Sequence, residues 1–248
     1  MASTVRSRTS LRRAVVLEVL RSALDERSAS GLDVLDAGGG SGGFAVPLAQ
    51  LGHRVTVLDP SPNSLAALER RAAEAEVSAL VSGVQGELSD LDAPGGSPAS
   101  YDLVLCHSVL EVVDDPAAAL VSVAGALRLD GMVSVLAANR TAAVLARAVA
   151  GHIAEANRLL TDPAGRSGHD DALARRFSLN ELLDLISGAG LRPARVHGIR
   201  VFTDLVPGQV LDADPLAGEA LVQLEYEAAH RREFFELATQ LHVLAVQA

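Results

Sequence analysis

Hydrophobic side chains along the chain occur in short, nearly continuous runs separated by longer amphipathic stretches. Runs of this length, rich in valine and leucine, are typical of strands that are buried on both faces. The predicted strands are Asp33 to Asp36, Arg54 to Leu58, Leu80 to Gln85, Tyr101 to Cys106, Gly131 to Ala137, Arg195 to Phe202 and Leu241 to Val246.

Amphipathic stretches between these runs predict helices. They are Leu11 to Ala23, Phe44 to Leu51, Ser64 to Ala75, Pro116 to Leu127, a helix from the capping box at Ser178 to about Gly188, and Gly218 to Phe235. The alternation of strands and helices predicts an α/β fold, doubly wound and Rossmann-like, with a seven-stranded, mostly parallel sheet.

Residues 139–177 interrupt this rhythm, because an alanine-rich segment is followed by the turn-rich run from Asp162 to Gly168. We expect a lid-like insertion after the fifth strand. The remainder predicts a single domain over residues 1–248, which opens with a helical lead in residues 1–30.

Composition restricts the class of protein. The net charge of −10 and the pI of about 5.1 argue against a broadly basic nucleic-acid binder, although a local basic patch stays open. The single cysteine, Cys106, excludes an intrachain disulfide and a cysteine metal cage, so we expect a reducing, cytoplasmic environment. The apolar run before Glu18 is too short for a signal peptide, and we expect no membrane span.

The most informative segment is a glycine-rich loop that follows the first predicted strand. Its glycines are Gly38, Gly39, Gly40, Gly42 and Gly43. Glycines at the carboxyl edge of a parallel sheet let the backbone turn sharply and approach a nucleotide-like ligand. The spacing satisfies the dinucleotide pattern GxGxxG, so an NAD(P)-dependent oxidoreductase is one interpretation.

Asp36 favours a different cofactor, because it extends the pattern to DxGxGxG. A carboxylate is poorly placed beside a pyrophosphate. It suits the amino-acid end of S-adenosyl-L-methionine, whose sulfonium is also positive. We therefore predict a methyltransferase that uses this cofactor.

Asp59 closes the second predicted strand about 20 residues after the glycines, where a carboxylate accepts hydrogen bonds from ribose hydroxyls of either cofactor. Together with Pro60 it is a candidate cofactor-binding pair. The alternative is that Asp59 only starts the turn that continues to Pro62.

His107 follows the fourth predicted strand and is the best candidate for a general base, although a structural role is equally consistent. Its neighbour Cys106 is expected to pack in the core. We expect no metal, since the sequence lacks HExxH and its seven histidines show no ligand spacing.

Three runs resemble a known family: residues 36–40, DAGGG; residues 105–116, LCHSVLEVVDDP; and residues 198–204, GIRVFTD. They are similar to the bacterial tRNA 5-carboxymethoxyuridine methyltransferases, which esterify the carboxylate of a modified wobble uridine. The resemblance implies a class I methyltransferase fold and assigns cofactor contacts to Arg12, Gly38, Gly39, Asp59, Leu88, Ser89 and His107. Without it, the preferred interpretation of Arg12 is a solvated arginine on an exposed helix face.

Arg200 lies in the third of these runs, and we hypothesise that its guanidinium binds an acceptor carboxylate. The sequence departs from the family pattern in one stretch that bears on tRNA binding. Related enzymes carry a lysine-rich stretch suited to phosphates, whereas Gly165 to Asp171 of this chain contains acids that offset its arginine. The methyl acceptor therefore stays open between tRNA and a small molecule methylated on oxygen or nitrogen, and a catalytically silent binding module is a third alternative. The oligomeric state is not predicted.

Overall fold

The computed structural model describes residues 8–26, 31–92, 99–213 and 216–247, without the side chains of residues 8–12, 92, 210 and 212–213. The chain packs as two compact units. We name them the sheet unit (residues 23–137, 181–195 and 243–248) and the insertion unit (residues 1–22, 138–180 and 196–242). The single domain over 1–248 stays a prediction.

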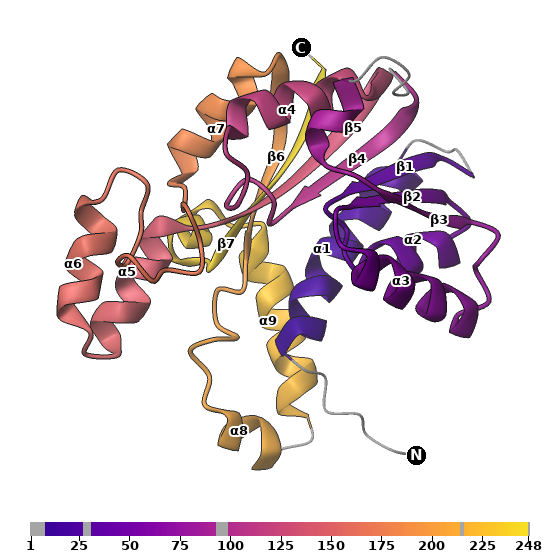
Figure 1. Cartoon of the computed structure of the whole chain (residues 1–248). Helices are drawn as coiled ribbons and strands as arrows, with labels where there is room; N and C mark the ends of the chain where they lie inside the picture. Colours follow the sequence, from indigo (N-terminus) through magenta and orange to yellow (C-terminus); the bar gives the residue numbers. More distant parts are fainter. Residues whose placement is uncertain (1–7, 27–30, 93–98, 214–215, 248) are drawn as a thin grey trace. The chain divides into compact units, whose positions relative to one another are not determined.

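Seven strands form one mostly parallel sheet in the order β3-β2-β1-β4-β5-β7-β6 (Figure 1). The strands are β1 (Asp33–Ala37), β2 (Arg54–Asp59), β3 (Val81–Gln85), β4 (Tyr101–His107), β5 (Leu127–Ala138), β6 (Leu191–Ile199) and β7 (Gln240–Gln247). The neighbouring pairs from β3 to β5 are parallel. The predicted fold class is confirmed.

The strand order reverses between β1 and β4, and at such a switch point loops from adjacent strands diverge and leave room for a ligand. Asp36 lies opposite Val57 of β2 and Leu105 of β4. A carboxyl group is thus carried into the middle of the sheet, just before the glycine loop.

The helices of the sheet unit are α2 (Ala45–Gln50), α3 (Pro62–Glu74), η1 (Leu88–Asp92), α4 (Pro116–Gly125) and most of α7 (Leu179–Gly188). Two of them, α3 and α4, begin at a side-chain cap. The Ser61 hydroxyl accepts from Ser64 N–H at 3.3 Å, and Asp115 accepts from Ala117 N–H at 2.9 Å. Figure 1 shows α2 and α3 on one face of the sheet and α4 on the other.

The predicted start of the fifth strand at Gly131 is wrong, because β5 already begins at Leu127. Leu127 pairs with Tyr101, whereas Met132 pairs with Leu103, so the intervening residues bulge out of the ladder. Asp130 adopts a φ of +66° there. The turn signal at Asp130 and Gly131 marks a bulge inside a strand.

The insertion unit contains more helix than the sequence indicated. Its helices are most of α1 (Arg8–Asp25), α5 (Arg140–Val149), α6 (Ile153–Thr161), α8 (Gly208–Ala213), α9 (Ala217–Ala229) and η2 (Arg232–Leu237). The helix predicted from Gly218 to Phe235 ends at Ala229 and is followed by a 3-10 turn. Arg12 lies in α1, but its side chain is outside the described part, so its cofactor contact stays a prediction.

The loop from residue 162 to 177 is ordered around a buried ion pair. Arg176 donates to both oxygens of Asp171, at 2.6 and 3.0 Å, and Ser167 N–H donates to the same carboxylate at 2.6 Å. The Arg176 guanidinium holds the pKa of Asp171 well below its usual range. The predicted insertion therefore has a fixed internal structure.

Asn139 connects three segments of the insertion unit. Its side-chain amide donates to the carbonyls of Phe235, Glu236 and Ala238, at 3.1, 3.2 and 2.8 Å. Its Oδ1 accepts from Thr141 N–H at 3.0 Å and caps α5. Only 1% of Asn139 is exposed, so each bond is shielded from water. None of the described helices is long and apolar enough to cross a membrane.

Replacing Asn139 with alanine leaves these buried carbonyls without their donor. We expect the free energy of unfolding to fall by about 2 kcal/mol, measured by urea denaturation followed by circular dichroism. The matched control is Asn157→Ala on the exposed side of α6, expected to change stability by less than about 0.5 kcal/mol. Equal effects of the two substitutions would contradict the stabilising role of the Asn139 hydrogen bonds.

Candidate active site

A cavity of about 760 Å³ opens in the sheet unit at the carboxyl ends of the central strands. Its size is in the range of small-molecule and cofactor sites. Four segments line it: Gly38 of the glycine loop, Leu58 to Pro60 after β2, Gly86 to Ser89 after β3, and Ser108 to Asp115 after β4, with one face of α4. The cavity therefore lies where the strand order predicts a ligand.

The glycine loop lies close against the segment after β4. Gly38 has a φ of +71°, and a Cβ on it would come within 2.6 Å of the Val109 side chain. Its N–H donates to Leu58 O at 2.7 Å, which ties the loop to β2. Any larger residue at Gly38 would displace either Val109 or the loop.

Asp59 joins the glycine loop to the start of α3. One carboxylate oxygen accepts from Gly40 N–H and the other from Ser61 N–H, each at 2.9 Å. The side chain also lines the cavity. Asp59 therefore starts the turn, and each of its oxygens keeps a lone pair for a further donor. Its contact with a ligand stays a prediction.

Asp36 lies beneath the glycine loop and does not line the cavity. Only 1% of the residue is exposed, and its Oδ2 has no hydrogen-bond partner among the described residues. A Cβ at Gly39 would collide with this carboxyl group. Burial, and to a smaller extent the charge of Asp59, raise the pKa of Asp36 to about 7.

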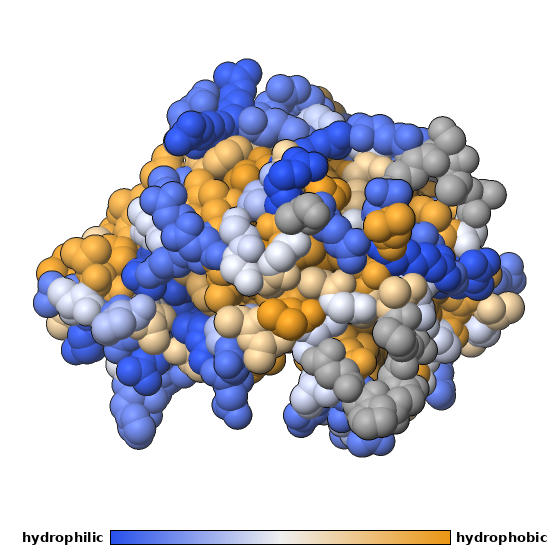
Figure 2. Space-filling view, turned by 90° about the horizontal axis from the view of Figure 1, so that it is seen from above, coloured by the Kyte–Doolittle hydropathy of each residue, from blue (hydrophilic) through white to orange (hydrophobic). Residues whose placement is uncertain are grey.

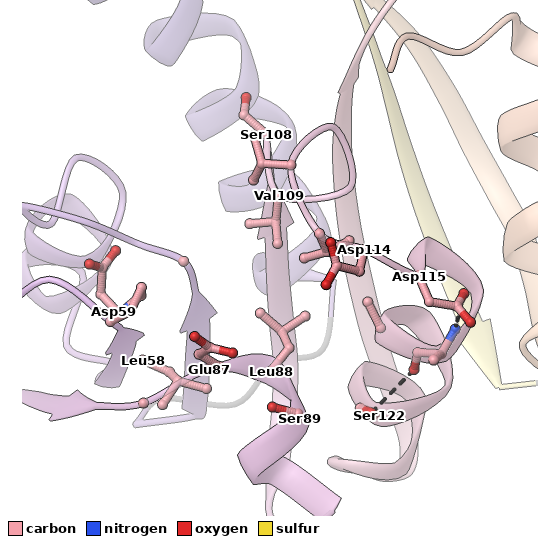
Figure 3. Close-up of a pocket in the computed structure, with 17 residues that line it drawn as sticks. Leu58, Asp59, Glu87, Leu88, Ser89, Ser108, Val109, Asp114, Asp115 and Ser122 are labelled. Atoms are coloured by element: carbon pink, nitrogen blue, oxygen red, sulfur yellow. Dashed lines mark hydrogen bonds between the residues drawn. The ribbon is translucent and has the colours of Figure 1, made fainter. Parts of the chain in front are cut away.

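Leu88 and Ser89 are brought to the cavity at the start of η1, as the resemblance implied. The turn before them is fixed by Asp90, whose carboxylate accepts from Glu87 N–H at 2.7 Å. Figure 3 shows Asp59 and Glu87 on one side of the cavity, facing two further acids on the other.

These two acids, Asp114 and Asp115, were not singled out as site residues from the sequence, although they lie in the family-like run after β4. Asp115 has a structural task as well, because its carboxylate caps α4. With Asp59 and Glu87 they make the charged part of the lining wholly acidic. Such a lining favours a cationic ligand.

His107 does not line the cavity. It is 8% exposed, its Nε2 lies 2.7 Å from Ser134 Oγ, and its ring packs edge-on against Phe44 with centroids 4.6 Å apart. Cys106 beside it is fully buried, and burial raises the pKa of its thiol to about 12. The prediction that Cys106 packs in the core is confirmed. A catalytic role for His107 stays a prediction.

The remaining predicted site residues are divided between the units. Gly40 and Gly42 lie in the glycine loop with φ of +57° and +77°, and Pro60 lines the cavity. Arg200 belongs to the insertion unit. Of the loop glycines that the sequence pointed to, Gly38 lines the cavity, and the acids of the segment after β4 were missed. The cofactor contacts of the loop stay predictions.

Comparisons with known proteins support the same assignment. Residues 35–135 match the family described as "Methyltransferase domain". Over 190 residues the chain is 38% identical to the ubiquinone biosynthesis O-methyltransferase of Methylocella silvestris, a match that covers 76% of this chain and 68% of the relative. The chain belongs to the class I S-adenosylmethionine-dependent methyltransferases. Its cofactor is S-adenosyl-L-methionine, which replaces the nicotinamide alternative.

Another relative of this methyltransferase is the tRNA 5-carboxymethoxyuridine methyltransferase of Escherichia coli. The two are 29% identical over 240 residues, which cover 95% of this chain and 87% of the relative. The fold is similar to magnesium protoporphyrin IX methyltransferase from Synechocystis, solved with bound S-adenosylhomocysteine. The TM-score is 0.63 at 16% identity, over 100% of this chain and 89% of that one.

The cavity fits this cofactor on its own geometry. Gly38 leaves space that a Cβ would fill, and Asp59 lines the wall with a carboxylate suited to ribose hydroxyls. Leu88 and Ser89 supply the wall after β3. The acids match the positive sulfonium and ammonium groups of the cofactor.

Substitution of Asp59 by alanine tests this arrangement. We expect the Kd for S-adenosylhomocysteine, measured by calorimetry, to rise at least about thirtyfold, because hydrogen bonds to a carboxylate contribute about 2 kcal/mol each. Glu74→Ala on the exposed face of α3 serves as the control and should bind normally. A folded Asp59→Ala protein with unchanged affinity would refute the ribose role.

Proposed function

We propose that this methyltransferase esterifies the carboxylate of 5-carboxymethoxyuridine in tRNA. The observation that carries the proposal is the extent of similarity to the Escherichia coli tRNA enzyme, which spans 95% of this chain. A match of that length includes most of the insertion unit as well as the sheet unit. Acceptor choice in this fold depends on such segments outside the shared cofactor site.

The chemistry suits a carboxylate acceptor. S-adenosyl-L-methionine supplies an electrophilic methyl group, and an ionised carboxylate attacks it without first losing a proton. A general base is therefore unnecessary, which agrees with the position of His107 away from the cavity lining. The protein's contribution is to align the acceptor oxygen with the methyl group and to exclude water.

Arg200 is the candidate to bind the acceptor carboxylate, and a rigid turn presents it. The buried Glu225 of α9 accepts from the backbone N–H groups of Val201, Phe202 and Thr203 at 2.9, 2.9 and 2.6 Å. These bonds explain why the strand predicted to reach Phe202 ends at Ile199. Arg200 itself has a φ of +62°, a conformation that costs about 1 kcal/mol and that these contacts offset.

The guanidinium of Arg200 is only partly engaged. Its Nη2 contacts both oxygens of Asp204 at 2.5 Å, whereas its Nε is buried and has no partner among the described residues. Asp204 also accepts from the Thr239 hydroxyl at 2.9 Å, which fixes it in place. Donors of Arg200 thus remain for an acceptor carboxylate.

A second candidate function is methylation of a small molecule on oxygen, as in the ubiquinone biosynthesis relative. Three arginines of the insertion form ion pairs within it: Arg147 with Glu155, Arg166 with Asp162, and Arg176 with Asp171. Paired arginines bind phosphates weakly, and phosphate contacts supply much of the affinity for nucleic acid.

The surface of α5 and α6 favours the same candidate. Its exposed apolar side chains are Leu145, Val149, Ile153 and Leu160. Hydrophobic side chains gather over this helix pair at the left edge of Figure 2. Such a surface suits an apolar compound better than it suits the backbone of tRNA.

Parallel assays with the two kinds of acceptor distinguish the two functions. The purified enzyme is given S-adenosyl-L-methionine with tRNA that bears unesterified 5-carboxymethoxyuridine, and in parallel with a panel of hydroxy- and carboxy-substituted aromatic molecules. We expect a methyl ester, detected by mass spectrometry of digested tRNA and removed by mild base. If a small molecule is methylated and the tRNA stays unesterified, the second candidate replaces the tRNA proposal.

Arg200→Ala tests the acceptor contact. A charge-assisted pair contributes about 2 kcal/mol, so we expect KM for the acceptor to rise about thirtyfold while the Kd for S-adenosylhomocysteine is unchanged. Arg192→Ala, at an exposed position of β6, is the matched control. An unchanged acceptor KM in a folded Arg200→Ala enzyme would remove Arg200 from acceptor binding.

A further inference from the structure

Asp36 is a buried acid, and no side chain that the structure describes balances its charge. It lies in the centre of the sheet between β2 and β4, with 1% of its surface exposed. Its Oδ2 accepts no hydrogen bond, and no arginine forms an ion pair with it within the part of the chain that the structure describes. A lone buried carboxylate is costly, so such a group is stable chiefly in its neutral form.

The titratable groups that face Asp36 increase this cost. Asp59 of β2 acts on it as a like charge. On β4 and the segment after it, the Cys106 thiol senses both Asp36 and the buried Glu111. Asp59 accepts two backbone N–H bonds, whereas Asp36 lacks such support at Oδ2.

We propose that Asp36 is a neutral carboxylic acid in the cofactor-free enzyme and that cofactor binding converts it to a carboxylate, with its proton released to solvent. The inference depends on the cofactor and not on the identity of the acceptor. The O–H bond of Asp36 breaks, its electron pair stays on the carboxyl oxygen, and the buffer takes up the proton.

The driving force is the positive charge of the bound ligand. The amino-acid end of S-adenosyl-L-methionine carries an ammonium, and an opposite charge near a buried carboxyl group favours its ionised form. The glycine loop separates Asp36 from the cavity by a single thin layer of backbone, because Gly39 contacts the carboxyl group and Gly38 lines the wall. No side chain intervenes at Gly39 to screen the two charges.

The proposal predicts the direction in which cofactor affinity changes with pH. Because the bound state has Asp36 ionised, the cofactor competes with a proton, and affinity falls as pH decreases. With the Asp36 pKa at about 7, the Kd for S-adenosylhomocysteine should rise about sixteenfold between pH 7 and pH 5.5. The ligand's own ammonium stays charged over this interval.

Calorimetry measures the released proton directly. Wild-type enzyme is titrated with S-adenosylhomocysteine at pH 6 in phosphate and in imidazole buffers, whose ionisation enthalpies differ. We expect about 0.9 proton released per ligand bound. Asp36→Asn should release none, and Asp102→Asn, at the amino end of the neighbouring strand β4, should release as many as wild type.

No released proton in the wild type would overturn the proposal, as would a release that Asp36→Asn leaves unchanged, which would assign the proton to another group such as Glu111. If Asp36→Asn does not fold, carbon NMR of aspartate-labelled wild type replaces it. A buried carboxyl resonance should then move from the neutral to the ionised position when S-adenosylhomocysteine binds. A resonance that is already ionised without ligand would refute the idea.

Discussion

The hydrogen bonds from Gly40 and Ser61 to the Asp59 carboxylate are the constraint on which the site depends. They fix the glycine loop to the end of β2, and they set the direction in which α3 departs. Without this bridge, the three loop glycines with positive φ would have little to restrict them. One carboxylate thus orders the backbone of the cavity and leaves lone pairs for a ligand.

Charge in the sheet unit is distributed unevenly between the two ends of the strands. At the amino ends, Arg128 bridges Asp33 and Asp102, so acids and arginines neutralise one another. At the carboxyl ends, the described residues that line the cavity include acids and no arginine. The imbalance is confined to the place where a cation binds, and the bound sulfonium and ammonium complete the local charge balance.

The insertion unit has a hydrophobic cluster around Val201, Ala228 and Ala238, and polar side chains fix its loops. Asn139, Asp171 and Glu225 each satisfy several donors or acceptors of otherwise irregular backbone. Such side chains specify one conformation of a loop, since a buried amide or carboxylate that lost its partners would be costly. This rigidity is what an acceptor site requires, because methyl transfer depends on alignment.

By itself, the sequence determined the strands and helices of the sheet unit, the glycine loop and the turn at Asp59, because these depend on local patterns of burial and turn chemistry. It did not reveal α5, α6 and α8. Only the tertiary structure decided which side chains share the cavity. Asp114 and Asp115 reach it because α4 starts there, whereas His107, one position before Ser108, is turned into contact with Phe44 and Ser134. The bulge at Asp130 and the turn held by Glu225 were likewise hidden, since each depends on partners distant in sequence. Local propensity fixes which elements form, but the direction of a side chain at the end of a strand is set by packing between elements.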